Sequence, residues 1–278
     1  MKCEGPIITS RQNPLILQLA SLATRKGRNA SGLFMVEGEK LVREAADAGL
    51  PVVSVIVSEG KSAEILPWVK EAYSDLRYEN TELRTVSDPC FLKISTEKSP
   101  QGVIAIIKHL DFFKRLTIIY DEELRNLQNK RAILLCSMQD PGNLGAVVRS
   151  AVAFGADTVI MSADCADVYN PKTLRAAMGC LFRIDVLVVE DMSSAVRALR
   201  GCGRRVLAAE LREGAVSLDE ISLRASDCVM IGNEGHGIPP ELSALCDASV
   251  YLPISARAES LNAASAAAVF LWEQQKCK

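Results

Sequence analysis

Residues 132–149, AILLCSMQDPGNLGAVVR, decide the fold of the C-terminal half of this chain. The apolar run 132–136 predicts a strand that is buried on both faces. Pro141 and Gly142 then predict a tight bend, and Asn143 is placed to cap a helix that begins near Gly145. A buried strand followed by a polar turn and a helix is the repeating unit of a parallel α/β sheet, and such turns are where these sheets bind ligands.

The same alternation continues toward the C-terminus. Further apolar runs predict strands at 158–161, 184–189, 206–209, 228–231 and 250–252. The segments between them predict helices at 145–154, 171–178, 193–199 and 240–245, and the alanine-rich residues 260–272 predict a last helix. Continuous apolar strands that alternate with helices favour a parallel sheet with helices on both faces.

The N-terminal part predicts a second, smaller α/β domain. Apolar runs predict strands at 33–36, 52–57 and 103–107, and apolar spacing predicts helices at 13–23, 39–48 and 63–73. The charged, asparagine-rich residues 109–130 predict a connector with room for a short helix. We therefore expect one domain at 1–108, the connector at 109–130 and a second domain at 131–278.

The composition is that of a globular protein. The 278 residues are 49% hydrophobic with a formal net charge of -2, so contact with nucleic acid would need a local basic patch. Nine cysteines lie at least fifteen positions apart, and only His109 and His236 are imidazoles, so no metal is expected. Because no secretory segment and no apolar run of membrane-spanning length is evident, we expect a cytoplasmic protein without disulfides or a membrane span.

A basic segment lies near the N-terminus. No acidic residue occurs in 5–36, whereas Arg11, Arg25, Lys26 and Arg28 all fall there. The last three are expected in a glycine-containing loop. Two interpretations remain open: a solvated surface loop, or an arm that contacts RNA phosphates.

A second polar turn, Gly232-Asn233-Glu234-Gly235-His236-Gly237, follows the predicted strand 228–231. Its three glycines allow positive φ and let a ligand approach the backbone. The turn is not a GxGxxG fingerprint, and no GxxxxGK[ST] occurs, so a Rossmann or P-loop nucleotide site is not supported. Glu234 could cap the next helix, hold a ligand, or hold another chain's arginine, whereas His236 is expected to be structural or solvent-facing.

A third turn begins at Pro253, and Ser260 and Asn262 then open the last predicted helix. Both side chains could be simple caps, just as Asn143 and Arg149 alone could be a cap and a surface residue. A Ser-His-Asp hydrolase is not supported because no GxSxG elbow occurs.

Together and in this order, the three turns resemble the motifs of the SpoU-type (TrmH-like) RNA ribose 2′-O-methyltransferases, within the SPOUT superfamily. The motif Asn-x-Gly-x-x-x-Arg is matched by Asn143, Gly145 and Arg149, the motif Gly-x-Glu-x-x-Gly by Gly232, Glu234 and Gly237, and the motif apolar-Pro-apolar with Ser-Leu-Asn by Leu252-Pro253-Ile254 and Ser260-Leu261-Asn262. The resemblance covers 131–278. One departure is Ala256, where the third motif commonly carries glycine.

The N-terminal part, with Phe34-Met35-Val36-Glu37-Gly38 and Gln101-Gly102-Val103, is similar to the L30e-like substrate-binding domain that often precedes this catalytic domain. The resemblance implies a deep trefoil knot, S-adenosylmethionine as cofactor, and a homodimer whose active site takes residues from both chains. It assigns cofactor contacts to Gly232, Asn233, Gly235, Leu252, Ile254, Leu261 and Asn262, and catalysis to Arg149, Asn143, Glu234, Ser260 and Asn262. Arg11, Arg25, Lys26 and Arg28 are the candidate RNA contacts.

The implied reaction is methylation of a ribose 2′-hydroxyl, for which an RNA substrate is required. In the family Arg149 is the usual candidate for the base, but a guanidinium resists deprotonation, so stabilisation of the forming alkoxide is the alternative. The two-domain layout favours ribosomal RNA. Transfer RNA as substrate, or a non-catalytic RNA-binding relative, are the competing hypotheses.

Overall fold

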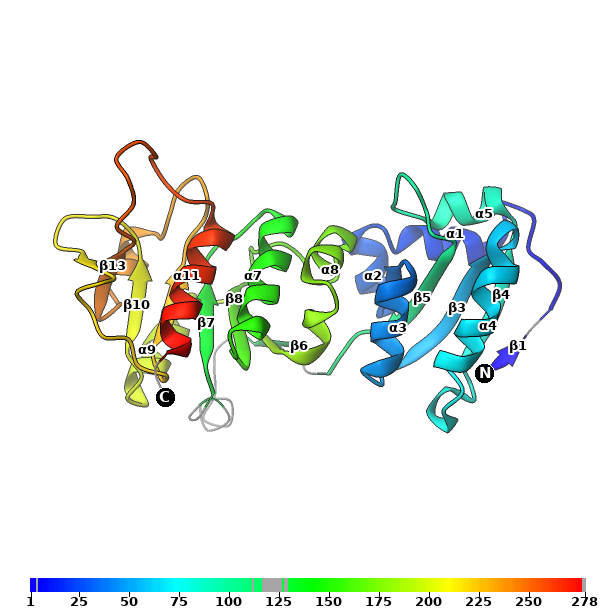
Figure 1. The fold of residues 1–278 in the computed structure, drawn as a ribbon, viewed down its shortest axis with the longest axis horizontal. Helices are drawn as coiled ribbons and strands as arrows, with labels where there is room; N and C mark the ends of the chain where they lie inside the picture. Colours follow the sequence, from blue (N-terminus) through cyan, green and yellow to red (C-terminus); the bar gives the residue numbers. More distant parts are fainter. Residues whose placement is uncertain (4, 112, 117–126, 128–129, 277–278) are drawn as a thin grey trace. The chain divides into compact units, whose positions relative to one another are not determined.

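The computed structural model describes residues 1–3, 5–111, 113–116, 127 and 130–276, and these form two compact units (Figure 1). The N-terminal unit comprises 1–110 and 167–182, and the C-terminal unit comprises 111–166 and 183–278. The short helix for which the connector has room would fall mainly on residues 117–126 and 128–129, which lie outside the described part of the chain.

The N-terminal unit is built on a five-stranded sheet of order β1-β4-β3-β5-β2. Its strands β2 (Leu33–Glu37), β3 (Val52–Ser58) and β5 (Val103–Lys108) confirm the three predicted apolar strands. Strands β1 (Lys2–Cys3) and β4 (Glu82–Val86) were not predicted, and β4 mixes charged and apolar residues, so it gives no continuous apolar signal. Strand β5 runs antiparallel to both of its neighbours, whereas β3 and β4 are parallel.

Helices cover this sheet, and their bounds are α1 (Pro14–Ser21), α2 (Arg25–Ser31), α3 (Glu39–Asp47), α4 (Ser62–Ala72), α5 (Asp88–Ile94) and α8 (Pro171–Ala177), with 3-10 turns η1 (Glu59–Lys61), η2 (Leu76–Tyr78) and η3 (Cys180–Arg183). Helix α8 belongs to this unit, although the sequence division placed residues 167–182 in the second domain. A buried ion pair between Arg28 and Asp167 and the contact of the Tyr169 ring with Phe34, 4.5 Å between centroids, attach this segment.

The predicted loop at 25–28 is wrong, because these residues lie in helix α2. The Thr24 hydroxyl caps the helix by accepting from the Gly27 backbone N–H. A Cβ on Gly27 would lie 2.1 Å from the Ser21 carbonyl oxygen, so only glycine lets α2 start this close to the end of α1. The glycine that indicated a loop is instead the residue that allows helix α2 to begin beside the end of α1.

The C-terminal unit is built on an eight-stranded sheet of order β11-β13-β10-β12-β7-β8-β9-β6, in which every pair is parallel. All six predicted strands are present as β7 (Ala132–Leu135), β8 (Thr158–Ser162), β9 (Asp185–Val189), β10 (Val206–Ala209), β12 (Cys228–Ile231) and β13 (Ala248–Tyr251). The short β6 (Phe113–Leu116) and β11 (Val216–Ser217) extend it at the edges. The expectation of a parallel α/β sheet is therefore confirmed.

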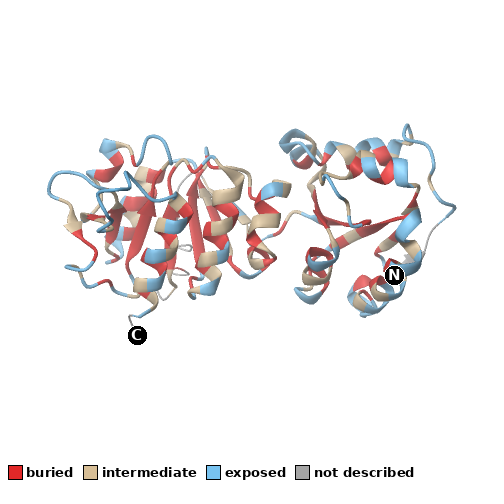
Figure 2. Cartoon of the chain, turned by 45° about the horizontal axis from the view of Figure 1, so that its top comes forward, coloured by how far each residue is buried: buried red, intermediate tan, exposed pale blue. Residues whose placement is uncertain are grey.

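The helices of this unit are α7 (Pro141–Ala153), α9 (Met192–Gly201), α10 (Pro240–Ser243) and α11 (Ala263–Gln275). Leu134, Ile160, Val206 and Met230 belong to one buried apolar cluster that joins the central strands to α9 and α10. Figure 2 shows that burial concentrates along the strands of both sheets, while the helices keep one face exposed. Among the residues that the structure describes, none of the helices combines the length and the apolar character needed to cross a membrane.

The strand order brings two distant turns together. Strand β12 lies directly beside β7, with Ile231 opposite Leu135, although about a hundred residues separate them in sequence. Because the strands are parallel, the turn after β7 and the turn after β12 leave the sheet at the same edge. Helices α7 and α11 also lie side by side (Figure 1). The first and second predicted motifs therefore start at neighbouring strand ends.

Candidate functional site

The turn after β7 is fixed by Asp140 rather than by Asn143. The Asp140 carboxylate accepts the Asn143 backbone N–H at 2.8 Å and is the N-cap of α7, with Pro141 at the first helical position. The prediction that Asn143 caps this helix is therefore wrong. Because Asp140 satisfies the helix end, the Asn143 side chain is left free to bond elsewhere.

Asn143, Glu234 and Asn262 form one chain of hydrogen bonds across the three motifs. The Asn143 Nδ2 donates to Glu234 Oε1 at 2.7 Å, and the Asn262 Nδ2 donates to Asn143 Oδ1 at 3.0 Å. An ionised carboxylate only accepts, so it orients the Asn143 amide and leaves its oxygen for Asn262. The Asn262 oxygen in turn caps α11 by accepting the backbone N–H groups of Ala264 and Ser265.

The loop after β12 is held tightly by its own backbone and by Asn233. Asn233 and Gly237 exchange two backbone hydrogen bonds of 3.0 Å, and Asn233 Oδ1 accepts from the backbone N–H groups of Gly235 and His236. The Asn233 Nδ2 donates to the Ser137 carbonyl oxygen at 2.7 Å. A Cβ on Gly232 would lie 2.4 Å from the Gly237 carbonyl carbon, so this position requires glycine. The loop is therefore a closed, preformed turn.

The third motif contains several exposed groups. Leu252 is half-buried, and Ile254 and Leu261 expose 39% and 41% of their surface. Ser260 is exposed, as is Arg149 on the outside of α7. Within the described residues, neither side chain makes a hydrogen bond or an ion pair. Thus the structure brings together Asn143, Asn233, Glu234 and Asn262 of the predicted residues, but it does not join Arg149 or Ser260 to them.

The groups near this edge limit the chemistry. Burial raises the pKa of the Cys165 thiol to about 11 and also raises the pKa of Cys136, so neither is a ready thiolate nucleophile. In the described part of the chain, no group of three or more His, Cys, Asp or Glu side chains is arranged to hold a metal ion. A carboxylate, amides and backbone N–H groups remain, and these bind and orient polar ligands.

Two polar residues that the sequence did not single out lie at the same edge: Ser162 ends β8, and Asp164 follows it. The Ser137 and Ser162 hydroxyls both donate to the Asp164 carboxylate at 2.5 Å. Partial burial opposes ionisation of Asp164, yet these hydrogen bonds hold its pKa below the usual value. No local pattern marks this carboxylate, because its partner Ser137 lies in the turn after another strand.

The four candidate RNA contacts differ in exposure. Arg11, Arg25 and Lys26 are exposed, whereas Arg28 is only 2% exposed. The Arg28 guanidinium binds the Asp167 carboxylate at 2.6 Å and the Leu22 carbonyl oxygen at 2.8 Å. We therefore withdraw Arg28 from the candidate phosphate contacts, because its donors are already used inside the unit.

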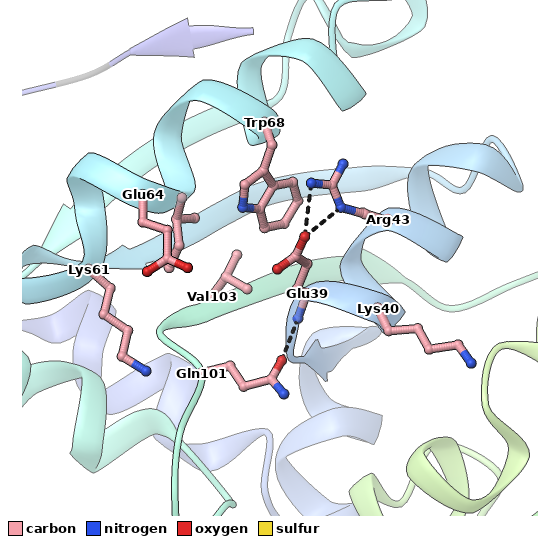
Figure 3. Close-up of a pocket in the computed structure, with 9 residues that line it drawn as sticks. Glu39, Lys40, Arg43, Lys61, Glu64, Trp68, Gln101 and Val103 are labelled. Carbon is pink, nitrogen blue, oxygen red and sulfur yellow. Dashed lines mark hydrogen bonds and ion pairs between the residues drawn. The ribbon is translucent and has the colours of Figure 1, made fainter.

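The N-terminal unit also contains an open pocket of about 530 Å³, shown in Figure 3. The Arg43 guanidinium lies over the Trp68 ring, 4.1 Å from its centroid, and also pairs with Glu39. Gln101 Oε1 accepts the Glu39 backbone N–H at 2.8 Å. The remaining lining residues are Lys40, Lys61, Glu64, Ile65 and Val103. The pocket thus combines an indole with cationic and hydrogen-bonding side chains.

Comparison with known proteins decides the family. Residues 130–272 match the model of the SpoU rRNA methylase family, and residues 13–105 match an MRM3-like substrate-binding domain. The chain belongs to the SpoU rRNA methylase family. All three motifs lie inside the first matched range, and the pocket and all candidate RNA contacts except Arg11 lie inside the second.

Individual relatives of this SpoU family chain resemble it over nearly their whole length. It is 32% identical to the Bacillus subtilis "23S rRNA (guanosine(2553)-2'-O)-methyltransferase RlmP" over 265 residues, covering 95% of this chain and 97% of that protein. The AdoMet-bound rRNA methyltransferase from Sinorhizobium meliloti superimposes with a TM-score of 0.81 at 27% identity, covering 98% and 97% of the two chains. The methyltransferase AviRb from Streptomyces viridochromogenes in complex with AdoMet gives a TM-score of 0.77 at 27% identity, covering 95% and 98%.

Proposed function

We propose that this protein transfers the methyl group of S-adenosylmethionine to a ribose 2′-hydroxyl of ribosomal RNA. The observation that carries the proposal is the hydrogen-bonded chain Glu234–Asn143–Asn262, which joins the three family motifs at one sheet edge. Membership of the SpoU family and the rRNA methyltransferases among its relatives support it.

The loop 232–237 and the apolar residues of the third motif fit the cofactor. Bound S-adenosylmethionine supplies an activated methyl group on sulfur, so the protein's task is to bind and orient. Backbone groups of Gly232, Asn233 and Gly235 would contact it, together with Leu252, Ile254, Leu261 and Asn262. The exposed apolar surface of Ile254 and Leu261, together with the polar loop, suits a ligand with an aromatic base and a polar end.

Asn143, Glu234 and Asn262 would position the cofactor and the ribose, with Ser260 as a further hydrogen-bonding group. Arg149 would stabilise the forming alkoxide while a phosphate or water accepts the proton, because a guanidinium keeps its own proton. Positioning of the hydroxyl in line with the sulfur would contribute much of the rate. The exposed, unpaired Arg149 suits a homodimer in which it serves the partner's site. The knotted topology and the cytoplasmic location that the family implies are also part of this proposal.

The test is the variant Arg149→Ala, with Arg197→Ala as control because Arg197 is also an exposed arginine on a helix of the same unit. Turnover on ribosomal RNA should be nearly abolished in the first and retained in the second, while both bind S-adenosylmethionine with similar affinity in calorimetry. Turnover of Arg149→Ala within a few-fold of wild type would contradict the assignment. No cofactor binding by wild type would favour a non-catalytic RNA-binding protein.

Recognition of RNA would lie in the N-terminal unit. Arg11, Arg25 and Lys26 would contact phosphates, and the pocket beside Trp68 would hold an unpaired nucleotide by stacking and cationic contacts. Replacing the three cations by alanine should flatten the salt dependence of RNA affinity. The slope of log affinity against log salt concentration should become shallower by roughly 0.7 for each lost contact with single-stranded RNA. Parallel assays on ribosomal and transfer RNA would separate the two substrate hypotheses.

A further inference from the structure

The turn after β7 contains a residue in a conformation that L-amino acids rarely adopt. Ser137 has a φ of 54°, and among the described residues only Met178 shares a positive φ without being glycine. This conformation costs a serine energy because its Cβ crowds the backbone. Ser137 therefore needs interactions that hold it there.

Those interactions come from the end of β8. The Ser137 backbone N–H donates to the Ser162 hydroxyl at 2.8 Å, and the Ser137 hydroxyl donates to Asp164 Oδ2 at 2.5 Å. The Ser162 hydroxyl donates to the other oxygen, Asp164 Oδ1, at 2.5 Å. Asp164 thus organises both donors of Ser137, one directly and one through Ser162.

The conformation of Ser137 matters because of where its carbonyl oxygen points. It accepts the Asn233 Nδ2 at 2.7 Å, while Asn233 Oδ1 holds the backbone N–H groups of Gly235 and His236. Glu234, the next residue, is the acceptor for Asn143. The Ser137 carbonyl oxygen therefore attaches the loop 233–237 to the turn after β7, in addition to the bond between Asn143 and Glu234.

We propose that Asp164 is a positioning residue for the cofactor loop: it fixes Ser137 at positive φ so that the Ser137 carbonyl oxygen anchors Asn233. This inference rests on the proposed function, since it assumes that loop 232–237 binds S-adenosylmethionine. Asp164 acts through Ser137 and Asn233 and does not itself touch the cofactor.

Calorimetric titration with S-adenosylmethionine tests the inference. Asp164→Ala should weaken affinity about fivefold to thirtyfold, which corresponds to the roughly 1–2 kcal/mol that a positive φ costs a residue with a Cβ. Glycine adopts positive φ without this cost, so adding Ser137→Gly to Asp164→Ala should restore affinity to within about twofold of wild type.

The control is Asp191→Ala, because Asp191 is an exposed carboxylate of the same unit that also accepts backbone and serine donors, as the cap of α9. It should lower the unfolding temperature and leave affinity unchanged. The inference is overturned if Asp164→Ala binds S-adenosylmethionine as tightly as wild type does, or if adding Ser137→Gly does not restore the affinity that Asp164→Ala has lost. In both cases the proposed function stands, because the wild-type protein still binds S-adenosylmethionine. If wild type does not bind S-adenosylmethionine, both fail.

Discussion

Replacing Gly232 by alanine tests whether the closed loop is the cofactor-binding element. The added Cβ would lie 2.4 Å from the Gly237 carbonyl carbon and 2.6 Å from the Ile238 backbone nitrogen. Non-bonded carbon atoms prefer separations of about 3.5–4.0 Å, so the loop backbone must move by roughly 1 Å. Neither neighbour can rotate away, because both contacts are backbone atoms.

A shift of this size breaks the pairing of Asn233 with Gly237, whose two hydrogen bonds measure 3.0 Å. Each bond contributes ~0.5–1.5 kcal/mol and the residual overpacking costs ~1–3 kcal/mol, so the closed loop loses about 2–6 kcal/mol. If the closed loop is the form that binds S-adenosylmethionine, affinity should fall by at least about 30-fold.

Calorimetry on the purified variant measures the affinity, and circular dichroism during thermal unfolding measures the stability. The matched control is Gly201→Ala, since a Cβ at this exposed end of α9 meets no atom within 4 Å. Its affinity should equal that of wild type. Wild-type affinity in the folded Gly232→Ala protein would refute the role of the loop, even if the protein were less stable.

Three further predictions concern residues that the structure links. Asn262→Ser keeps a good helix cap but loses the amide that donates to Asn143. Turnover should therefore fall about fivefold, while the free energy of unfolding changes by less than about 0.5 kcal/mol. Turnover equal to that of wild type would remove the hydrogen-bond chain from the mechanism. Arg28→Met leaves the half-buried Asp167 carboxylate unpaired, so urea unfolding should show a loss of about 3 kcal/mol, against almost none for the exposed Arg25→Met. Burial lowers the pKa of His109 below its usual value of 6.5, so near this pH the folded state binds fewer protons than the unfolded state. The contribution of His109 to stability should therefore be fully present above pH 6.5 and should be lost as the pH falls through the pKa of the folded state. His109→Gln should flatten this dependence below pH 6.5, and an unchanged slope would place its origin elsewhere.

Local sequence predicted much of the sheet. The six apolar strands of the C-terminal unit and three strands of the N-terminal unit appear where the apolar runs lie, with ends within about two residues. These predictions succeed because burial on both faces requires an unbroken apolar run, which is a property of consecutive residues. The mixed strand β4 and the edge strand β6 lack such a run, and neither was predicted.

Charged and polar residues were predicted less well, because their roles depend on distant partners. Arg25 and Arg28 look alike in sequence, yet one is exposed and the other is buried against Asp167, 139 positions away. Asn143 was expected to cap its own helix, but Asp140 does so and Asn143 bonds to Glu234 instead. In each case the partner is set by which segments meet in space.

The sequence by itself determined which segments are buried, where the polar turns fall and which family motifs they carry, because hydrophobic periodicity and motif spacing are local. Only the tertiary structure decided that β12 pairs with β7, that Glu234, Asn143 and Asn262 share one hydrogen-bonded chain, and that Asp164 holds Ser137. Strand order sets which strand ends are neighbours, and a hydrogen bond forms only between groups that the fold brings within about 3 Å of one another.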